Sequence, residues 1–287
     1  MSDFLMNIIP KIPVSEGVTW AVEKMTEWFA FLFDPIKEQF GSFMEFVSGL
    51  LGSIPPVIFI IIVAVIAFLL TGKKLGLATF SIVGLWFVLN QGYWEQMIDT
   101  VTLVIISSVL SVILGVPIGI LMSKSKIASA IITPILDFMQ TMPAFVYLIP
   151  AVAFFGIGMV PGVIASLIFA TPPTVRFTNL GIRQVSDELV EAADAFGSTG
   201  AQKLFKVELP MARPTIMAGI NQTVMLSLSM VVIASMIGAP GLGREVLSAL
   251  QRSQVGPGFV SGVGIVILAI IIDRLTQTLS KEKKEEN

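Results

Sequence analysis

A stretch of 20 residues, EAADAFGSTGAQKLFKVELP (Glu191–Pro210), concentrates charge and glycine between two long apolar segments. The chain has no cysteine and no histidine, so thiol chemistry, disulfides, imidazole bases and the commonest metal ligands are absent. No metal or cofactor is therefore expected in this chain. Ala192, Ala193 and Ala195 instead offer a surface of little side-chain bulk for close contact with another protein. The alternative is a solvated connecting loop.

Local signals predict a helix, a glycine turn and a second helix in this stretch. Ser186 is placed to cap the first helix, which is expected over residues 187–196 and to end at Gly197. Thr199, with a glutamine three residues later, has the spacing of a capping box for the second helix. Pro210 is expected to end that helix, and a proline four residues later to open the next apolar segment.

The composition predicts an all-α integral membrane protein. Hydrophobic residues make up 54% of the 287 and charged residues 13%, about half the share in an ordinary soluble domain. Apolar runs of about 20 residues can cross the bilayer as helices. Seven spans are expected, at residues 54–71, 76–93, 97–122, 129–155, 160–179, 214–238 and 258–275.

Prolines fall inside three adjacent predicted spans, where each is expected to interrupt or kink its helix: Pro117, Pro143, Pro150, Pro172 and Pro173. Kinked helices around a solute pathway are one interpretation, and the general abundance of proline in membrane helices is the other. Charge is scarce in the central spans, where Asp137 and Asp273 lie near span ends that could reach an interface. This scarcity disfavours autonomous ion-coupled pumping.

The N-terminal segment predicts two helices lying in the membrane interface. Apolar residues recur with helical spacing over residues 18–32 and again over 36–50, opposite acidic positions, and Pro35 is expected to separate the two helices. A disordered tail is the alternative. The first residues lack the basic and apolar regions of a cleavable signal peptide, so insertion is expected to rely on the spanning helices.

The positive charges predict the orientation of the chain. Thirteen of the 18 Lys and Arg residues fall on one side if the loops alternate. Since positive loops remain cytoplasmic, the N-terminus is expected outside, and the C-terminus and Glu191–Pro210 in the cytoplasm. The net charge of −2 and the scattered basic residues indicate no nucleic-acid partner.

The spelling of the charged stretch resembles a family motif. Glu191-Ala192-Ala193, Gly197 four residues later, and Val207-x-Leu209-Pro210 at the end are similar to the EAA motif of permease subunits in ATP-binding-cassette (ABC) importers. Val207 stands where that pattern has isoleucine, which is the only departure. The match covers 20 residues, between spans and on the predicted cytoplasmic side.

The resemblance implies a fold, partners and residue roles. It implies a type I importer permease with a five-helix core at 95–275, a coupling loop at 180–213 that docks on an ATPase, two scaffold spans at 54–94, an interfacial segment at 1–53 and a charged tail at 276–287. The motif carries the coupling role onto Glu191, Ala192, Ala193, Gly197, Leu209 and Pro210. A homodimer, two separate ATPase subunits that use ATP and Mg, and an extracytoplasmic binding protein are the expected partners in a bacterial cytoplasmic membrane.

Two further segments, Met139–Gly158 and Gly238–Gln251, look like those of glycine betaine and proline betaine permeases. The resemblance implies a small zwitterionic solute, and it makes the first segment a candidate translocation path, with Met142, Pro143, Phe145 and Tyr147, and also Phe154 and Phe155. Packing or lipid contact is the alternative for the aromatic residues. In the second segment, Gly241, Gly243 and Arg244 are candidates for docking the binding protein, or for a structural turn.

Two other functions stay open at this point. The same kind of permease could carry choline, carnitine or an amino acid. A secondary carrier or channel would need no ATP, but inverted repeats and ionisable groups at mid-membrane, which would favour it, are not clear in the sequence.

Overall fold

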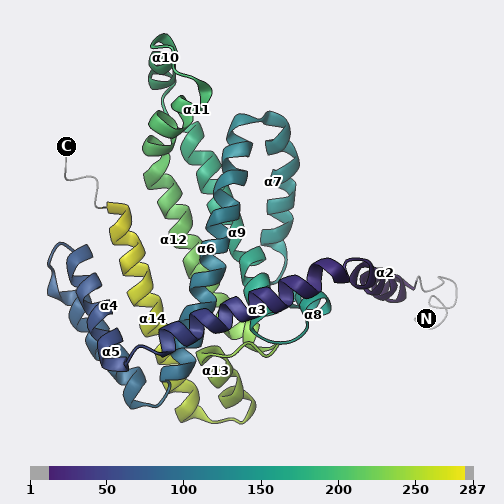
Figure 1. Cartoon of the computed structure of the whole chain (residues 1–287), viewed down its shortest axis with the longest axis vertical. Helices are drawn as coiled ribbons and strands as arrows, with labels where there is room; N and C mark the ends of the chain where they lie inside the picture. Colours follow the sequence, from purple (N-terminus) through teal and green to yellow (C-terminus); the bar gives the residue numbers. More distant parts are fainter. Residues whose placement is uncertain (1–12, 282–287) are drawn as a thin grey trace, which may run out of the picture.

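The computed structural model of the chain describes residues 13–281, and all regular structure in this range is helical, as predicted. Figure 1 shows long helices side by side, with α10 and α11 at one end, here named the loop end, and α13 at the opposite end. In chain order the helices are α2 (Val14–Trp28), α3 (Ala30–Gly52), α4 (Pro56–Leu70), α5 (Leu75–Asn90), α6 (Trp94–Lys124), α7 (Lys126–Thr141), η1 (Ala144–Tyr147), α8 (Leu148–Phe155), α9 (Met159–Arg183), α10 (Asp187–Ala195), α11 (Gly200–Lys203), η2 (Leu204–Glu208), α12 (Leu209–Ser235), α13 (Leu242–Gln251) and α14 (Val255–Lys281).

Four single helices in the described part of the chain are long and apolar enough to cross a membrane: α6, α9, the continuous run that ends in α12, and α14. Two bent pairs, α3 with α4 and α7 with α8, would raise the number to six. Each of the seven predicted spans contains a helix, but α4 has 15 residues and α5 has 16, so that these two form a short hairpin.

The fourth predicted span, residues 129–155, is not one helix. α7 ends at Thr141, and the chain bends by 109° into η1 and α8. Met142 has an extended backbone (ψ 135°), because a following proline disfavours the helical conformation of the residue before it. The bend at Pro143 is therefore the interruption that the sequence predicted.

The other prolines do not break their helices as predicted. Pro117 lies inside α6, and Pro172 and Pro173 lie buried inside α9, both of which continue through them. Pro35 also lies inside α3, and the break between the N-terminal helices occurs at Phe29 instead. A proline removes one helical hydrogen bond, and close packing of α6, α9 and α12 compensates for that loss in the two central helices.

Small residues bring α6, α9 and α12 together. A Cβ atom added to Gly119 of α6 would lie 2.5 Å from Cβ of Thr178 in α9, and one added to Gly219 of α12 would lie 2.6 Å from Cβ of Phe177. Membrane helices have no hydrophobic drive to associate within lipid, so close backbone approach at small residues supplies much of their packing energy. These three helices form the rigid centre of the protein.

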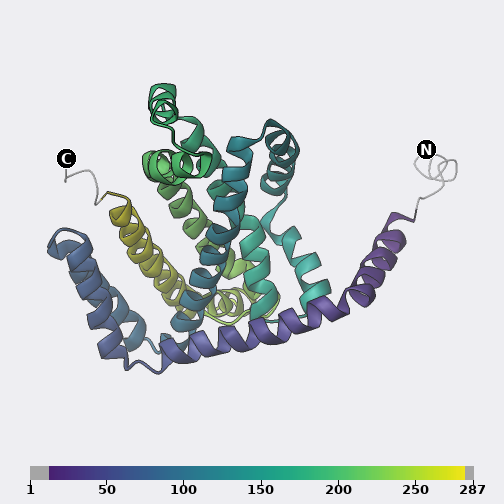
Figure 2. The same cartoon turned by 45° about the horizontal axis from the view of Figure 1, so that its top comes forward.

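Helix α3 lies across the end of the bundle that is opposite the loop end, and α2 extends beyond the bundle (Figure 1 and Figure 2). In Figure 2, α3 runs beneath the long helices from the α4–α5 hairpin towards α8. Ser48 of α3 donates a hydrogen bond to Asp99 of α6 (2.8 Å), and Phe33 stacks on Phe154 with ring centroids 4.9 Å apart. Trp20 and Trp28 of α2 are exposed, and tryptophan is enriched at membrane interfaces, which fits the predicted interfacial helices.

Candidate functional site

The loop end begins with α10, which has the predicted length to within one residue. Its first turn holds two acidic residues, but the predicted side-chain cap by Ser186 is wrong, because Ser186 makes no such hydrogen bond. The helix ends as predicted at Gly197, whose φ is +73°. The N–H of Gly197 donates to the carbonyl of Asp194 (2.9 Å) and that of Ser198 to the carbonyl of Ala193 (3.0 Å). This is the Schellman pattern, which requires a left-handed residue and so favours glycine.

The second helix of the loop starts as predicted and ends differently. Thr199 and Gln202 form the capping box, with their reciprocal hydrogen bonds at 2.9 and 3.3 Å. The prediction that Pro210 ends this helix is wrong, because helical structure continues from Gly200 to Ser235. The turn just before Pro210, η2, is a π-helix. The prolyl ring of Pro210 would clash with the carbonyl four residues earlier in a regular α-helix, and the wider turn relieves that clash.

One ion pair joins the two helices of the loop, and a second attaches the loop to the bundle. Lys203 bonds both carboxylate oxygens of Asp194 at 2.8 Å, which joins α11 to α10. Lys124, the last residue of α6, pairs with Glu208 of η2, whose side chain is 6% exposed. Leu209 packs beside Ile182 of α9. The loop therefore contacts α6 through Lys124 and α9 through Ile182, and it continues directly into α12.

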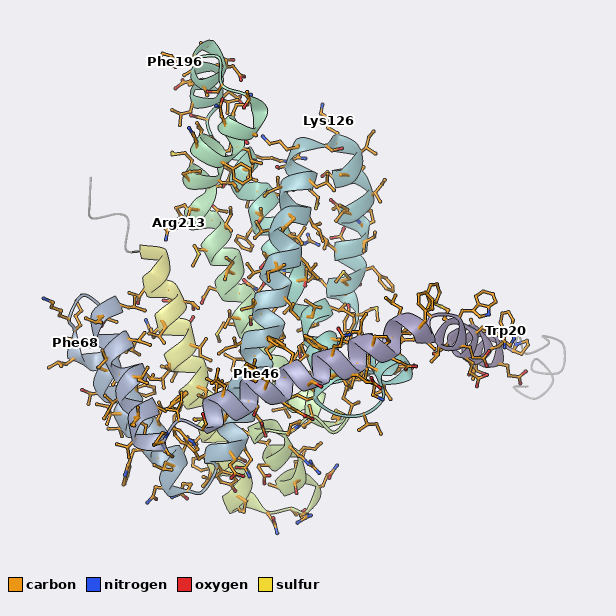
Figure 3. All side chains as sticks on the ribbon, in the orientation of Figure 1. Trp20, Phe46, Phe68, Lys126, Phe196 and Arg213 are labelled. Carbon is orange, nitrogen blue, oxygen red and sulfur yellow. The ribbon has the colours of Figure 1, made fainter. Side chains whose placement is uncertain are left out.

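The tip of the loop is exposed. Glu191, Ala192 and Gly197 are exposed there, whereas Ala193 is buried and supports the fold of the loop. Phe196 is 91% exposed and projects at the extreme end of the molecule (Figure 3). Sequence reasoning overlooked Phe196, although an aromatic residue directly before the helix-ending glycine was a readable signal. Exposed aromatic rings of this kind are typical anchors of protein interfaces.

The ion pair between Lys124 and Glu208 allows a direct test of this attachment. Lys124→Met leaves a buried carboxylate without its cation and is expected to destabilise the protein, whereas Lys124→Met with Glu208→Met removes both charges and is expected to recover most of the loss. Because Lys124 is 42% exposed, we expect a coupling energy of about 1 kcal/mol. Thermal unfolding of the purified single and double variants measures it, and additive effects would contradict the attachment.

The candidate path residues of the first segment do not surround one space. Tyr147 is buried, its hydroxyl donates to the carbonyl of Met139, and its ring meets Phe169 edge-on. Met142 packs on the same cluster, while Pro143 and Phe145 are exposed at the bend. Phe154 and Phe155 both pack on Phe33 of α3. Their part in translocation stays a prediction, and packing accounts for the contacts of Tyr147, Phe154 and Phe155.

The candidate docking residues differ from one another in exposure. Gly241 and Gly243 are buried. They pack closely, since a Cβ at Gly241 would lie 2.6 Å from Oγ1 of Thr100 and one at Gly243 would lie 2.4 Å from the carbonyl of Val231. These glycines hold α13 against α6 and α12. Arg244 is exposed at the end opposite the loop end, so of the three it alone can reach a partner.

Comparison with known proteins agrees with this architecture. The structure resembles a solved inward-facing MetNI methionine ABC transporter with a TM-score of 0.61 and 21% identity, over 69% of this chain and 96% of that one, which shows a shared fold. A family model for the binding-protein-dependent transport system inner membrane component matches residues 112–285. The chain belongs to this family of membrane transport subunits.

Two curated relatives match the chain over nearly its full length. It is 56% identical to the glycine betaine/carnitine transport permease protein GbuB of Listeria monocytogenes, over 98% of this chain and all of that protein. It is 50% identical to the glycine betaine transport system permease protein OpuAB of Bacillus subtilis, over 97% of this chain and 98% of that protein. The predicted kinship with betaine permeases is thereby confirmed.

Proposed function

We propose that the chain is the transmembrane subunit of an ATP-driven importer for glycine betaine and related compounds such as proline betaine. The observation that carries the proposal is the 56% identity to a glycine betaine/carnitine permease over the whole of that protein. The intact loop motif from Glu191 to Pro210 adds the expected means of coupling to an ATPase. Choline or an amino acid as the solute, and an ATP-independent carrier, are the alternatives that the experiment below separates.

Coupling would pass from an ATPase through the loop to the bundle. The chain has no phosphate-binding loop of its own, so ATP and Mg belong to a separate ATPase subunit. In a homodimer of this chain, two loops would rest on two ATPases, with Phe196 and Ala192 at each contact. Closure of the ATPases would shift the loops, and the rigid connections at Lys124 and Leu209 would carry that shift into the long helices as an inward-to-outward change.

The loop end is proposed to be cytoplasmic in a bacterial cell membrane, with the N-terminus outside and the C-terminus inside. Basic residues gather at this end, among them Lys124, Lys126, Arg183 and Lys203, and basic loops are retained in the cytoplasm. The opposite end, with α3, α13 and the exposed Arg244, would then face an extracytoplasmic binding protein that delivers the solute.

Uptake of labelled glycine betaine tests the proposal. The chain is reconstituted in proteoliposomes with its ATPase and binding protein, with and without internal ATP. We expect uptake to require ATP and both partners, and proline betaine to compete. Uptake by this chain alone would indicate a carrier, and an assembled ATP-hydrolysing complex that ignores betaine would overturn the solute assignment.

A further inference from the structure

An ion pair joins α9 to α7 within the helical bundle. Nη2 of Arg176 in α9 is 2.5 Å from Oδ1 of Asp137 in α7, and the side chains are 38% and 57% exposed. Arg176 precedes the end of α9 by seven residues and Asp137 follows the start of α7 by 11. At 1.5 Å per residue these positions lie about 10 and 16 Å along the helix axes from the ends of α9 and α7 that are nearer the loop end. Half-exposed charges are costly against lipid, so within a membrane such a pair faces water or protein.

Helical geometry places this pair on the side of the bundle away from α6. Thr174 and Thr178 of α9 meet the glycines of α6. Arg176 is two residues from each, a rotation of about 200°, and so lies on the opposite side. On α12, Val224 packs in a cluster that contains residues of α6. Gln222 is two residues from Val224, so it lies on the side of α12 that is away from α6. The same side therefore carries polar groups on two adjacent helices.

This side is hollowed beside α12. A shallow hollow of roughly 290 Å³ is lined by six residues of that helix: Ala218, Asn221, Gln222, Met225, Leu226 and Ser229. A water occupies about 30 Å³ of liquid volume, so the hollow has room for several waters or for one small solute. Asn221 is bonded to Asp273 and Thr276 of α14, and Ser229 to the carbonyl of Met225, so the amide of Gln222 is the group left to bond a polar molecule as it passes.

The guanidinium of Arg176 has hydrogen-bonding capacity to spare. It donates to Asp137 through Nη2, and no other hydrogen bond of this group is found within residues 13–281. Because Nε is shielded from water, the donors open to a solute are the remaining terminal N–H groups of this side chain, which is 38% exposed. A guanidinium offers five N–H donors in a planar fork that matches a carboxylate. Asp137, beside it, offers negative charge to a cation. Two opposite charges on neighbouring helices are complementary to a solute that carries both charges.

We propose that Arg176 and Asp137 form a transient site for a small zwitterion, in which Arg176 binds the carboxylate of the solute and Asp137 faces its ammonium group. This inference rests on the proposed function. Because the solute has to compete with the existing ion pair, its affinity stays low, which permits release on each cycle. Zwitterionic lipid headgroups share this chemistry, and the measurements with betaine below distinguish the two.

Arg176→Gln in the complete transporter tests the site. We expect the betaine taken up per ATP hydrolysed to fall at least about tenfold, since bonds to charged groups are the strong ones, while the ATPase rate stays within about twofold. Arg176→Lys, which keeps the charge, is expected to recover much of the loss. Lys24→Gln is the matched control, because it breaks an exposed pair with Glu27 on α2, away from the bundle.

Three results would overturn the site. The betaine taken up per ATP hydrolysed could stay unchanged in Arg176→Gln, uptake and ATP hydrolysis could fall equally in that variant, or Lys24→Gln could lose as much uptake per ATP as Arg176→Gln. A second measurement does not depend on transport. Saturation-transfer NMR of the betaine N-methyl signal with the purified complex is expected to show contact with the wild type and a loss of contact in Arg176→Gln. If the wild type takes up no betaine but its NMR contact signal still exceeds that of Arg176→Gln, the proposed function is wrong and the site stands. Equal NMR contact signals in the wild type and Arg176→Gln would refute the site.

Discussion

Gly119→Val is expected to prevent stable folding of this permease. The new Cβ would lie 2.5 Å from Cβ of Thr178 and 2.7 Å from the carbonyl oxygen of Val175, and neither the β-branched side chain nor the backbone of α9 can move away easily. Overpacking costs about 1–3 kcal/mol where the surroundings yield, and this contact lies in the rigid centre formed by α6, α9 and α12. We expect a loss of most of the monodisperse protein in detergent, measured by size-exclusion chromatography.

Gly76→Val is the matched control for this prediction. Gly76 also lies in a helix, α5, but a Cβ there meets no atom within 4 Å. We expect the control to elute like the wild type and to unfold at nearly the same temperature. If Gly119→Val did the same, the close α6–α9 contact would not be a determinant of folding.

Gly197→Asp is expected to abolish ATP-driven uptake while the subunit still folds. A Cβ at Gly197 meets no atom within 4 Å, and aspartate tolerates the left-handed backbone (φ +73°) better than most residues. In the assembled importer, a side chain and a charge would enter the contact with the ATPase. An unpaired charge in an interface costs several kcal/mol, so we expect uptake to fall by about a hundredfold.

Gly197→Asn separates the two causes of that loss, because asparagine has the size of aspartate and also tolerates the left-handed conformation, but carries no charge. We expect it to retain more uptake than Gly197→Asp. Normal ATP-driven uptake by a well-assembled Gly197→Asp complex would refute the coupling role of this loop. Uptake and ATP hydrolysis are measured in the same proteoliposomes so that uncoupling is visible as hydrolysis without transport.

Local features of the fold could be predicted from the sequence because their causes lie within a few residues. The left-handed end of α10 at Gly197 follows from the lack of a Cβ, and the capping box at Thr199 follows from two polar side chains three residues apart. The bend at Pro143 likewise follows from the proline ring, which disfavours a helical backbone at the preceding Met142. The failed cap at Ser186 shows the limit, since a suitable side chain need not take the bonding rotamer.

The sequence by itself determined that this chain is an all-helical membrane protein with an exposed loop of EAA type. The lengths of its hydrophobic runs, the positions of its charges and the residues of the motif can be recognised without knowledge of tertiary contacts. Only the tertiary structure decided which prolines bend their helices, that Glu208 is buried against Lys124, and that Arg176 meets Asp137. Those partners are 84 and 39 residues apart. Their contact depends on how α6, α7 and α9 pack, and packing is set by shape complementarity over many residues at once.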